Sequence, residues 1–385
     1  MSSTRRDFCS GALTMLLHSS SFAQTRAAAP EGSTARPNVA AIDRDRILAQ
    51  AERALALPVM PITAIAADRS PGPVHDYYSE PTDQADPFLA HRDALFTLGH
   101  TVPALAAAYL ITHEERYAKL AAAQMQAWFV TRETAMTPTL EFAQVATSAK
   151  TGRMEGVLEG LPLIEIAQSL PFLATSESFT EELTGGVTRW FMQYLDWLNS
   201  ARSAGLARDA HDHNGSSWML QAAACARLNL KDDSALTTLR HQFRSTTIRA
   251  QIAYDGNFSR ELSTPNPYRN SLFNLDLLCG ACELLSTRFE KVWDYELQDG
   301  PGMRVAIARY FPFIANRNAW PYRADAAFFT QLPLRRPALL LAARAYSRPE
   351  YADVWRTLPA DTSNPELDRS FPIRQPLLWV TRPRP

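Results

Sequence analysis

The segment 179–199 carries the clearest structural signal in this 385-residue sequence. Its apolar residues recur every three or four positions, as in the buried stripe of an amphipathic helix: Leu183, Val187, Trp190, Tyr194 and Leu198. Ser178 and Glu181 stand at the spacing of a capping box and predict the start of that helix. Similar periodicity runs through most of the chain, whereas the alternation typical of strands is scarce. The sequence therefore predicts an all-α fold.

The predicted helices follow one another in pairs. Besides 179–199, they cover a segment beginning near 101 and residues 41–57, 114–130, 153–170, 216–229, 234–252, 270–287, 303–316 and 335–358. No repeat of fixed period is visible, which argues against a solenoid. Helix hairpins without strands predict an (α/α) toroid, an incomplete barrel whose loops line a groove suited to a long polymer. We expect a single domain of this kind over residues 41–385.

The N-terminal residues resemble a targeting segment. Arg5 and Arg6 precede a short apolar stretch at 11–17, and small residues follow it. This pattern predicts a signal peptide over residues 1–29, of twin-arginine type unless the arginine pair arose by chance in an ordinary signal. Residues 30–40 are predicted to form a disordered linker. We therefore expect a periplasmic or secreted protein, and we find no later stretch apolar enough to cross a membrane.

Charge and cysteine content exclude several classes of function. The 39 basic and 40 acidic residues nearly cancel, so the chain lacks the basic character of a nucleic-acid-binding protein. Cys279 and Cys282 lie on one face of an apolar helical segment, where cysteine is usually a small core residue. No second cysteine or histidine pair stands at metal-ligand spacing. We expect no metal and no cofactor.

Polar and aromatic residues gather in the loops between the predicted helices. The loops hold HDYYSE at 75–80, residues 137–153, HDHNGSSW at 211–218, residues 260–276 and WPYR at 320–323. His211 and His213 flank Asp212, and this triplet allows metal ligation, proton transfer with carboxylate binding, or a solvated surface loop. The chain carries no nucleophile elbow, phosphate loop or zincin motif.

Several of these motifs, in this order, resemble the alginate lyase family. They are HDYYSE at 75–80, MTPTLEFAQ and TGR within 136–153, RELSTPNPYRNSLFNLD at 260–276, DGPGMRVA at 299–306, WPYRAD at 320–325, RRPALLLAARAYSRPEY at 335–351 and FPIRQPLLW at 371–379. The resemblance implies a lyase that cleaves an anionic, uronate-containing polysaccharide, such as alginate or glucuronan, by β-elimination. Its partner would be an acidic polysaccharide or oligosaccharide.

The sequence departs from the family pattern at the catalytic positions. The family's Asn-Asn-His run corresponds to Asp212, His213 and Asn214. The positions of its arginine and second tyrosine hold Thr264 and Asn270, and neither side chain is a general base near neutral pH. The first tyrosine of that motif is kept as Tyr268.

The resemblance, adjusted for these substitutions, implies particular roles. His213 would be the base, Tyr268 the acid, and Asn214 and Arg269 would hold the substrate carboxylate. Residues expected to contact sugars are Arg153, Gln144, Trp320 and Tyr322. Two alternatives remain at this point: an impaired relative that still binds acidic polysaccharide, and a helical-toroid glycoside hydrolase, which would need two facing carboxylates.

Overall fold

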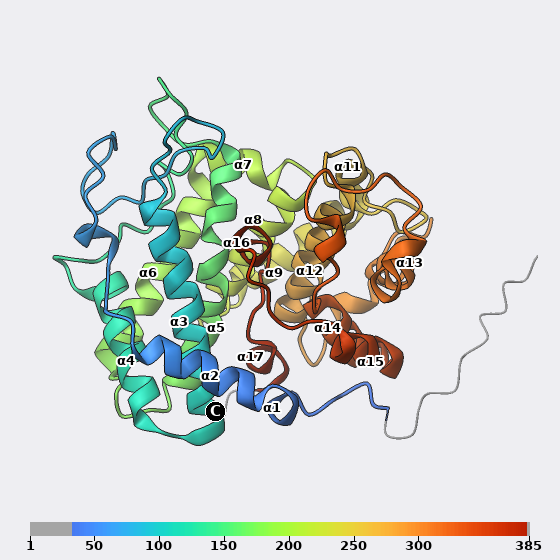
Figure 1. Cartoon of the computed structure of the whole chain (residues 1–385), viewed down its shortest axis with the longest axis horizontal. Coiled ribbons are helices and arrows are strands. Elements are labelled where there is room, and N and C mark those ends of the chain that lie inside the picture. The colour runs from blue at the N-terminus through green and yellow to red at the C-terminus, as the bar shows by residue number, and fades with distance from the viewer. Residues whose placement is uncertain (1–32, 383–385) are drawn as a thin grey trace, which may run out of the picture. The chain divides into compact units, whose positions relative to one another are not determined.

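The structure is a computed structural model that describes residues 33–382, so the predicted signal peptide lies outside the described residues. Its α-helices are α1 Val39–Ile42, α2 Arg44–Leu55, α3 Ala90–Thr112, α4 Glu115–Met125, α5 Leu161–Leu173, α6 Glu181–Ser200, α7 Arg202–Arg208, α8 His213–Ala226, α9 Ser234–Gln242, α10 Ile248–Gln251, α11 Ser259–Leu262, α12 Pro267–Leu285, α13 Met303–Ala315, α14 Pro337–Tyr346, α15 Pro349–Thr357, α16 Pro365–Arg369 and α17 Pro376–Val380 (Figure 1). Shorter 3-10 and π turns are η1 Ile62–Ala64, η2 Gln126–Val130, η3 Met154–Gly160, η4 Phe243–Thr247, η5 Val292–Asp294, η6 Arg317–Ala319 and η7 Phe329–Gln331. Between residues 33 and 382, β pairing is limited to two isolated bridges, which confirms the all-α prediction.

The inner helices form a continuous row. α3 packs against α5, α5 against α8, α8 against α12, and α12 against α14. The helices α4, α6, α13 and α15 pack on the outside of this row, against α3, α8, α12 and α14 respectively. This is the hairpin arrangement that the paired helical segments predict.

Neighbouring inner helices α8 and α12 run parallel. The His213 ring lies 5.7 Å from the Phe273 ring, and seven residues further along both helices a Cβ at Gly280 would lie 3.1 Å from Leu220. Parallel inner helices begin at the same end, so the loops that precede α8 and α12 meet there. In Figure 1 the labels of α7 and α11, the helices that directly precede these two loops, both stand in the upper part of the view.

The start of α6 differs from the predicted capping box. Thr180 is the N-cap residue, and its hydroxyl accepts a hydrogen bond from the Leu183 amide at 3.2 Å. Ser178 instead donates to a carboxylate oxygen of Glu115 at 3.2 Å. The predicted stripe of α6 is buried throughout, so its role as core is confirmed.

Helix α3 is longer than its sequence pattern indicates. It begins at Ala90 rather than near Thr101. Gly99 weakens the helical signal, but it is needed for packing, because a Cβ there would lie 2.4 Å from the Pro162 Cβ on α5. By length and composition α3 could cross a membrane, contrary to our expectation that no later segment could, yet most of it is buried inside the fold. Its apolar residues therefore have a place in the core.

The domain begins earlier than predicted. Residues from Ser33 onward belong to one compact unit, α1 begins at Val39, and Ser33 donates a hydrogen bond to Asp353. The described residues of the predicted 30–40 linker are thus part of the folded domain. Cys279 and Cys282 are free and buried on α12, as expected for core residues.

The C-terminal segment returns to the first inner helices. The buried carboxylate of Glu165 on α5 accepts hydrogen bonds from the backbone amides of Arg374 and Gln375, at 2.8 and 2.9 Å. It also accepts one from the Trp379 indole at 3.0 Å. Helix α17 packs against α1, α3 and α5. The end of the described chain therefore closes the row of helices on its beginning.

Candidate active site

His213 is the first residue of α8 and is held by a buried carboxylate. Its backbone amide donates to Glu261 Oε1 at 2.7 Å, and its Nδ1 lies 2.9 Å from Glu261 Oε2. Glu261 is fully buried, whereas the His213 side chain is 19% exposed. Within residues 33–382, Nε2 of His213 has no hydrogen-bond partner. Two bonds to one carboxylate fix the ring and leave its far nitrogen available for chemistry.

The surroundings of His213 favour its charged form. Burial opposes the imidazolium, but the hydrogen bond and charge of Glu261 outweigh it, so the pKa of His213 is raised. The nearby charge of Arg269 acts in the opposite direction. The positive charge of Arg269 therefore acts at the His213 ring.

Asn214 follows His213 and is oriented by the helix cap. Asp212 is the N-cap of α8, and its Oδ1 accepts from the Asn214 backbone amide at 2.8 Å and from Asn214 Nδ2 at 3.0 Å. Asn214 is 4% exposed, and its Oδ1 has no partner in the described part of the chain. The amide is therefore fixed in one orientation beside His213.

The two positions that depart from the family pattern contact each other. Asn270 Nδ2 donates to Thr264 Oγ1 at 3.1 Å, and that hydroxyl donates to the Glu261 carbonyl at 2.7 Å. The guanidinium of Arg323 donates to the carbonyl of Thr264. A cation therefore lies beside position 264 even though the residue there is threonine.

Tyr268 is a packing residue in this structure. It is fully buried, its hydroxyl donates to the Phe313 carbonyl at 2.9 Å, and its ring meets Trp320 edge-on at 5.0 Å. Burial raises the pKa of its phenol well above the usual value. A buried hydroxyl bonded to a carbonyl is not available to a polysaccharide, so this geometry does not favour the expected acid role.

Arg269 lies at the first turn of α12. Its backbone amide donates to Asp325 Oδ2 at 2.9 Å, and its guanidinium lies 5.9 Å from the centre of the Phe328 ring. No salt bridge from the Arg269 side chain is present among residues 33–382. Its charge is therefore free to meet a substrate carboxylate.

Arg153 and Gln144 belong to a second group of loops. Arg153 Nε donates to Gln144 Oε1 at 3.0 Å and lies 3.4 Å from Glu155. The backbone amide of Gln144 donates to Ser79 Oγ at 2.8 Å, and the Ser79 hydroxyl donates to the carboxylate of the buried Glu159 at 2.5 Å. These hydrogen bonds join the 75–80 loop to the 137–153 loop, so one hydrogen-bond network holds both Arg153 and Gln144 in place.

Trp320 and Tyr322 differ in exposure. Trp320 is 8% exposed, and its indole donates to the Arg323 carbonyl at 3.0 Å, which makes it largely a core residue. Tyr322 is half-buried, and its hydroxyl oxygen accepts from Arg309 at 2.9 Å. Because the oxygen accepts this bond, the Tyr322 hydroxyl proton can be donated elsewhere.

Sequence reasoning missed three partners of this site. Glu261 and Arg323 lie within motifs that the sequence analysis names, at 260–276 and 320–325, but neither was given a role, and Arg309 lies outside those motifs. Glu261 lies 48 residues after His213, and no local spacing links the two. Within residues 33–382, no group of three or more His, Cys, Asp or Glu residues is arranged to hold a metal ion.

Comparison with known proteins agrees with this architecture. The family model described as alginate lyase matches residues 34–320. No curated protein matches the sequence. The crystal structure of an alginate lyase from Bacteroides ovatus is similar to 89% of this chain and 94% of its own, with 22% identity and a TM-score of 0.76.

Two further similar structures are of alginate lyase A1-III. The enzyme from Sphingomonas species A1 covers 91% of this chain and 98% of its own, with 13% identity and a TM-score of 0.50. A variant of A1-III complexed with a tetrasaccharide covers 92% of this chain and 96% of its own, with 13% identity and a TM-score of 0.53. These likenesses confirm the predicted toroid of helix hairpins.

Proposed function

The chain belongs to the alginate lyase family, and we propose that it cleaves its polyuronate by β-elimination with His213 as the base. It is a polysaccharide lyase for an alginate-type substrate. The proposal concerns which residues of this chain carry out the reaction, since the family's arginine and second tyrosine are replaced here by Thr264 and Asn270.

β-Elimination makes specific demands on the site. The base removes the ring proton next to the carboxylate, the electron pair forms a double bond in the ring, and the bond to the glycosidic oxygen breaks. That oxygen receives a proton as it leaves. The ring proton next to the carboxylate is acidic enough to be removed only when hydrogen-bond donors offset the negative charge of that carboxylate.

The hydrogen bonds of His213 support its role as base. Glu261 holds Nδ1, so a neutral ring carries its proton there and offers the Nε2 lone pair to the substrate. After proton transfer the buried carboxylate stabilises the imidazolium. This anchored ring, with one free nitrogen, is the observation that carries the proposal.

Arg269 and Asn214 are proposed to hold the substrate carboxylate. The charge of Arg269 lowers the pKa of His213, and the Arg269 side chain has no salt bridge in the described part of the chain. Asn214 Nδ2 uses one proton on Asp212 and retains a second. Each can donate to a carboxylate oxygen beside the base.

The proton donor is proposed to be Tyr322 rather than Tyr268. The Tyr322 oxygen accepts a hydrogen bond from Arg309, so its own proton stays available. The Tyr268 hydroxyl instead donates its proton to the buried carbonyl of Phe313. Arg309 also donates to Asn257 Oδ1 at 3.1 Å. This bond links Arg309 and Tyr322 to the segment before α11, the helix that carries Glu261. Arg153 and Gln144 are retained as proposed sugar contacts in the second loop group.

Export remains a proposal about the N-terminal segment. Arg5 and Arg6, followed by a short apolar stretch and small residues, support a cleaved twin-arginine signal and a periplasmic or secreted location.

The test is incubation with polymannuronate, polyguluronate and glucuronan, with ultraviolet absorbance as the readout. A lyase creates a conjugated double bond, whereas a hydrolase produces only new reducing ends. We expect absorbance to rise with wild type and to fall by about 10²–10⁴-fold in initial rate with His213→Ala. Equal rates for the two proteins would reject His213 as the base. Polymer binding without any absorbance change would reject catalysis itself.

A further inference from the structure

A cavity of about 300 Å³ lies outside the loops described above. Its walls come from α2, α3, the start of α14 and the C-terminal segment 360–376. None of the proposed catalytic or sugar-contacting residues lines it. Its volume is at the lower end of small-molecule sites.

The cavity has an excess of positive charge. Four arginines line it against two aspartates: Arg46, Arg53, Arg335 and Arg374 against Asp361 and Asp368. Asp43, behind the wall, pairs with two of the arginines, and a third lies 3.8 Å from Asp368. The exposed Arg53 has no salt bridge among the described residues. An anionic ligand is therefore favoured over a neutral or cationic one.

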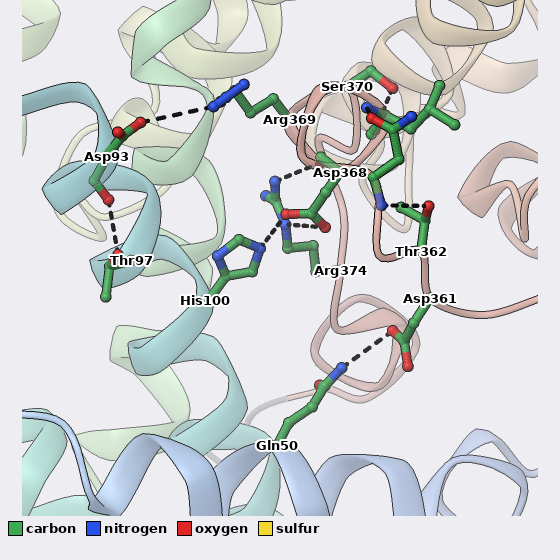
Figure 2. A network of polar contacts seen from close by, with 12 residues as sticks. Gln50, Asp93, Thr97, His100, Asp361, Thr362, Asp368, Arg369, Ser370 and Arg374 are labelled. Carbon is green, nitrogen blue, oxygen red and sulfur yellow. Dashed lines mark hydrogen bonds and ion pairs between the residues drawn. The ribbon is translucent and has the colours of Figure 1, made fainter. Parts of the chain in front are cut away.

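A polar network surrounds the cavity (Figure 2). His100 on α3 lies 2.8 Å from Asp368 on α16, and Arg374 donates to the Asp368 carbonyl at 2.8 Å. Across from them, Gln50 on α2 donates to Asp361 at 3.2 Å. These contacts fix side chains from three separate parts of the chain around one space, so the site is already formed without a ligand.

Several buried polar atoms of the lining lack partners. The Nε atoms of Arg46, Arg335 and Arg374 are buried donors with no hydrogen-bond partner in residues 33–382. Gln375 is 2% exposed, and its buried side-chain oxygen likewise accepts no hydrogen bond from residues 33–382. Because these atoms are shielded from solvent, they do not face the open cavity, and the charge of the lining arginines is what favours an anionic ligand.

The rest of the lining is apolar. Leu57, Pro337, Phe371, Ile373 and Pro376 supply its hydrophobic surface. A pyranose ring presents C–H groups on its faces and hydroxyls on its edges, so it fits a site with an apolar wall and polar margins. An inorganic anion would leave this wall without contacts.

We propose that this cavity binds a free uronate sugar of one or two rings, with the carboxylate near the arginines and the ring against the apolar wall. The inference goes beyond the proposed catalytic assignment and does not depend on it. A short uronate bound here would occupy a second site, separate from the His213 loops.

Titration calorimetry of the full mature chain tests the proposal with sodium D-mannuronate as the probe. We expect saturable binding with a Kd on the order of 1 mM or tighter. D-Mannose, which has the same ring without the carboxylate, should bind at least about tenfold more weakly. Inorganic phosphate should also bind more weakly, because it lacks the ring. Equal affinity for mannose or for phosphate would overturn the proposed ligand class.

Two matched charge reversals on α2 locate the binding. Arg53 and Arg44 are both exposed, but only Arg53 lines the cavity. We expect Arg53→Glu to weaken mannuronate binding by about tenfold and Arg44→Glu to leave it unchanged. If both variants weakened mannuronate binding equally, the effect would come from the general charge of the surface, and the proposed binding site would be wrong.

Two more variants separate this site from the catalytic loops. Thr362→Trp, at a half-buried position in the cavity wall, should abolish mannuronate binding while circular dichroism stays unchanged. His213→Ala should leave the binding intact. Loss of binding with His213→Ala, or its survival in Thr362→Trp, would place the sugar elsewhere and overturn the proposal.

Discussion

The side chains of Asn270 and Thr264 are hydrogen-bonded to each other, with Asn270 Nδ2 donating to Thr264 Oγ1 at 3.1 Å. These are the two positions at which the sequence departs most from the family pattern. A tyrosine and an arginine have been replaced by a pair of smaller residues that satisfy each other's polar groups. The surrounding loop is therefore stable without either of the usual groups.

Restoring both usual groups should increase turnover. The double variant Thr264→Arg with Asn270→Tyr places a phenol and a cation where the family has them, and we expect polymannuronate cleavage to rise by about 10-fold or more. The absorbance of the unsaturated product measures it. Each single change breaks the Asn270–Thr264 bond without supplying the other group, so neither should reproduce the gain. A double variant no faster than wild type would show that His213 already provides full catalysis.

Removing the charge of Glu261 should change the pH profile. His213 must be neutral to act as base, so kcat/KM should rise with pH through a His213 pKa that Glu261 holds above its usual value. Glu261→Gln keeps the shape of the side chain and removes the charge that favours the imidazolium. We expect the rising limb to move to lower pH and the plateau rate to fall. An unchanged limb would mean that another group titrates.

The two tyrosines should respond differently to loss of their hydroxyls. Tyr322→Phe should lower turnover by about 10²-fold if its proton goes to the leaving oxygen, with little loss of stability. Tyr268→Phe should leave turnover nearly unchanged but cost about 1 kcal/mol of unfolding free energy, because the Phe313 carbonyl loses its donor. Initial rates and urea melts on the same preparations separate the two effects. The opposite pattern would return the acid role to Tyr268.

Two glycines provide a test of helix packing. Gly99→Ala places a Cβ against Pro162 and should lower the unfolding free energy by about 1–3 kcal/mol. Gly205 lies on α7 with nothing within 4 Å of its Cβ direction, so Gly205→Ala should raise stability by about 0.5–1 kcal/mol. Equal effects would mean that the contact between α3 and α5 relaxes freely.

The N-terminal proposal is tested by intact mass. Material recovered from the periplasm should lack residues up to about 23 or 29. Replacing Arg5 and Arg6 with lysines should retain the precursor in the cytoplasm if the signal is of twin-arginine type. Export of the lysine variant at the wild-type rate would indicate an ordinary signal.

Helical periodicity predicted most of the fold because burial follows local spacing. The α6 stripe from Leu183 to Leu198 is buried as expected. The first part of α3 was missed because Gly99 lowers helix propensity, and only its tertiary neighbour Pro162 explains its presence. In the same way, the loop sequences identified His213 but not its partner Glu261. The burial of Tyr268 depends on Trp320 and Phe313, which no local pattern connects to it.

The closure of the fold on Glu165 has a consequence for the order of folding. The donors that satisfy this buried carboxylate lie on residues 374, 375 and 379, about 200 residues after it. A ribosome reaches them only after α3, α5, α8, α12 and α14 have all been made. Until then, α5 carries a carboxylate whose burial has no compensating hydrogen bonds, and burial raises the pKa of Glu165. Completion of the helical row therefore has to wait until residues 374–379 have been made, and a chain truncated before Arg374 should leave the inner helices only loosely assembled.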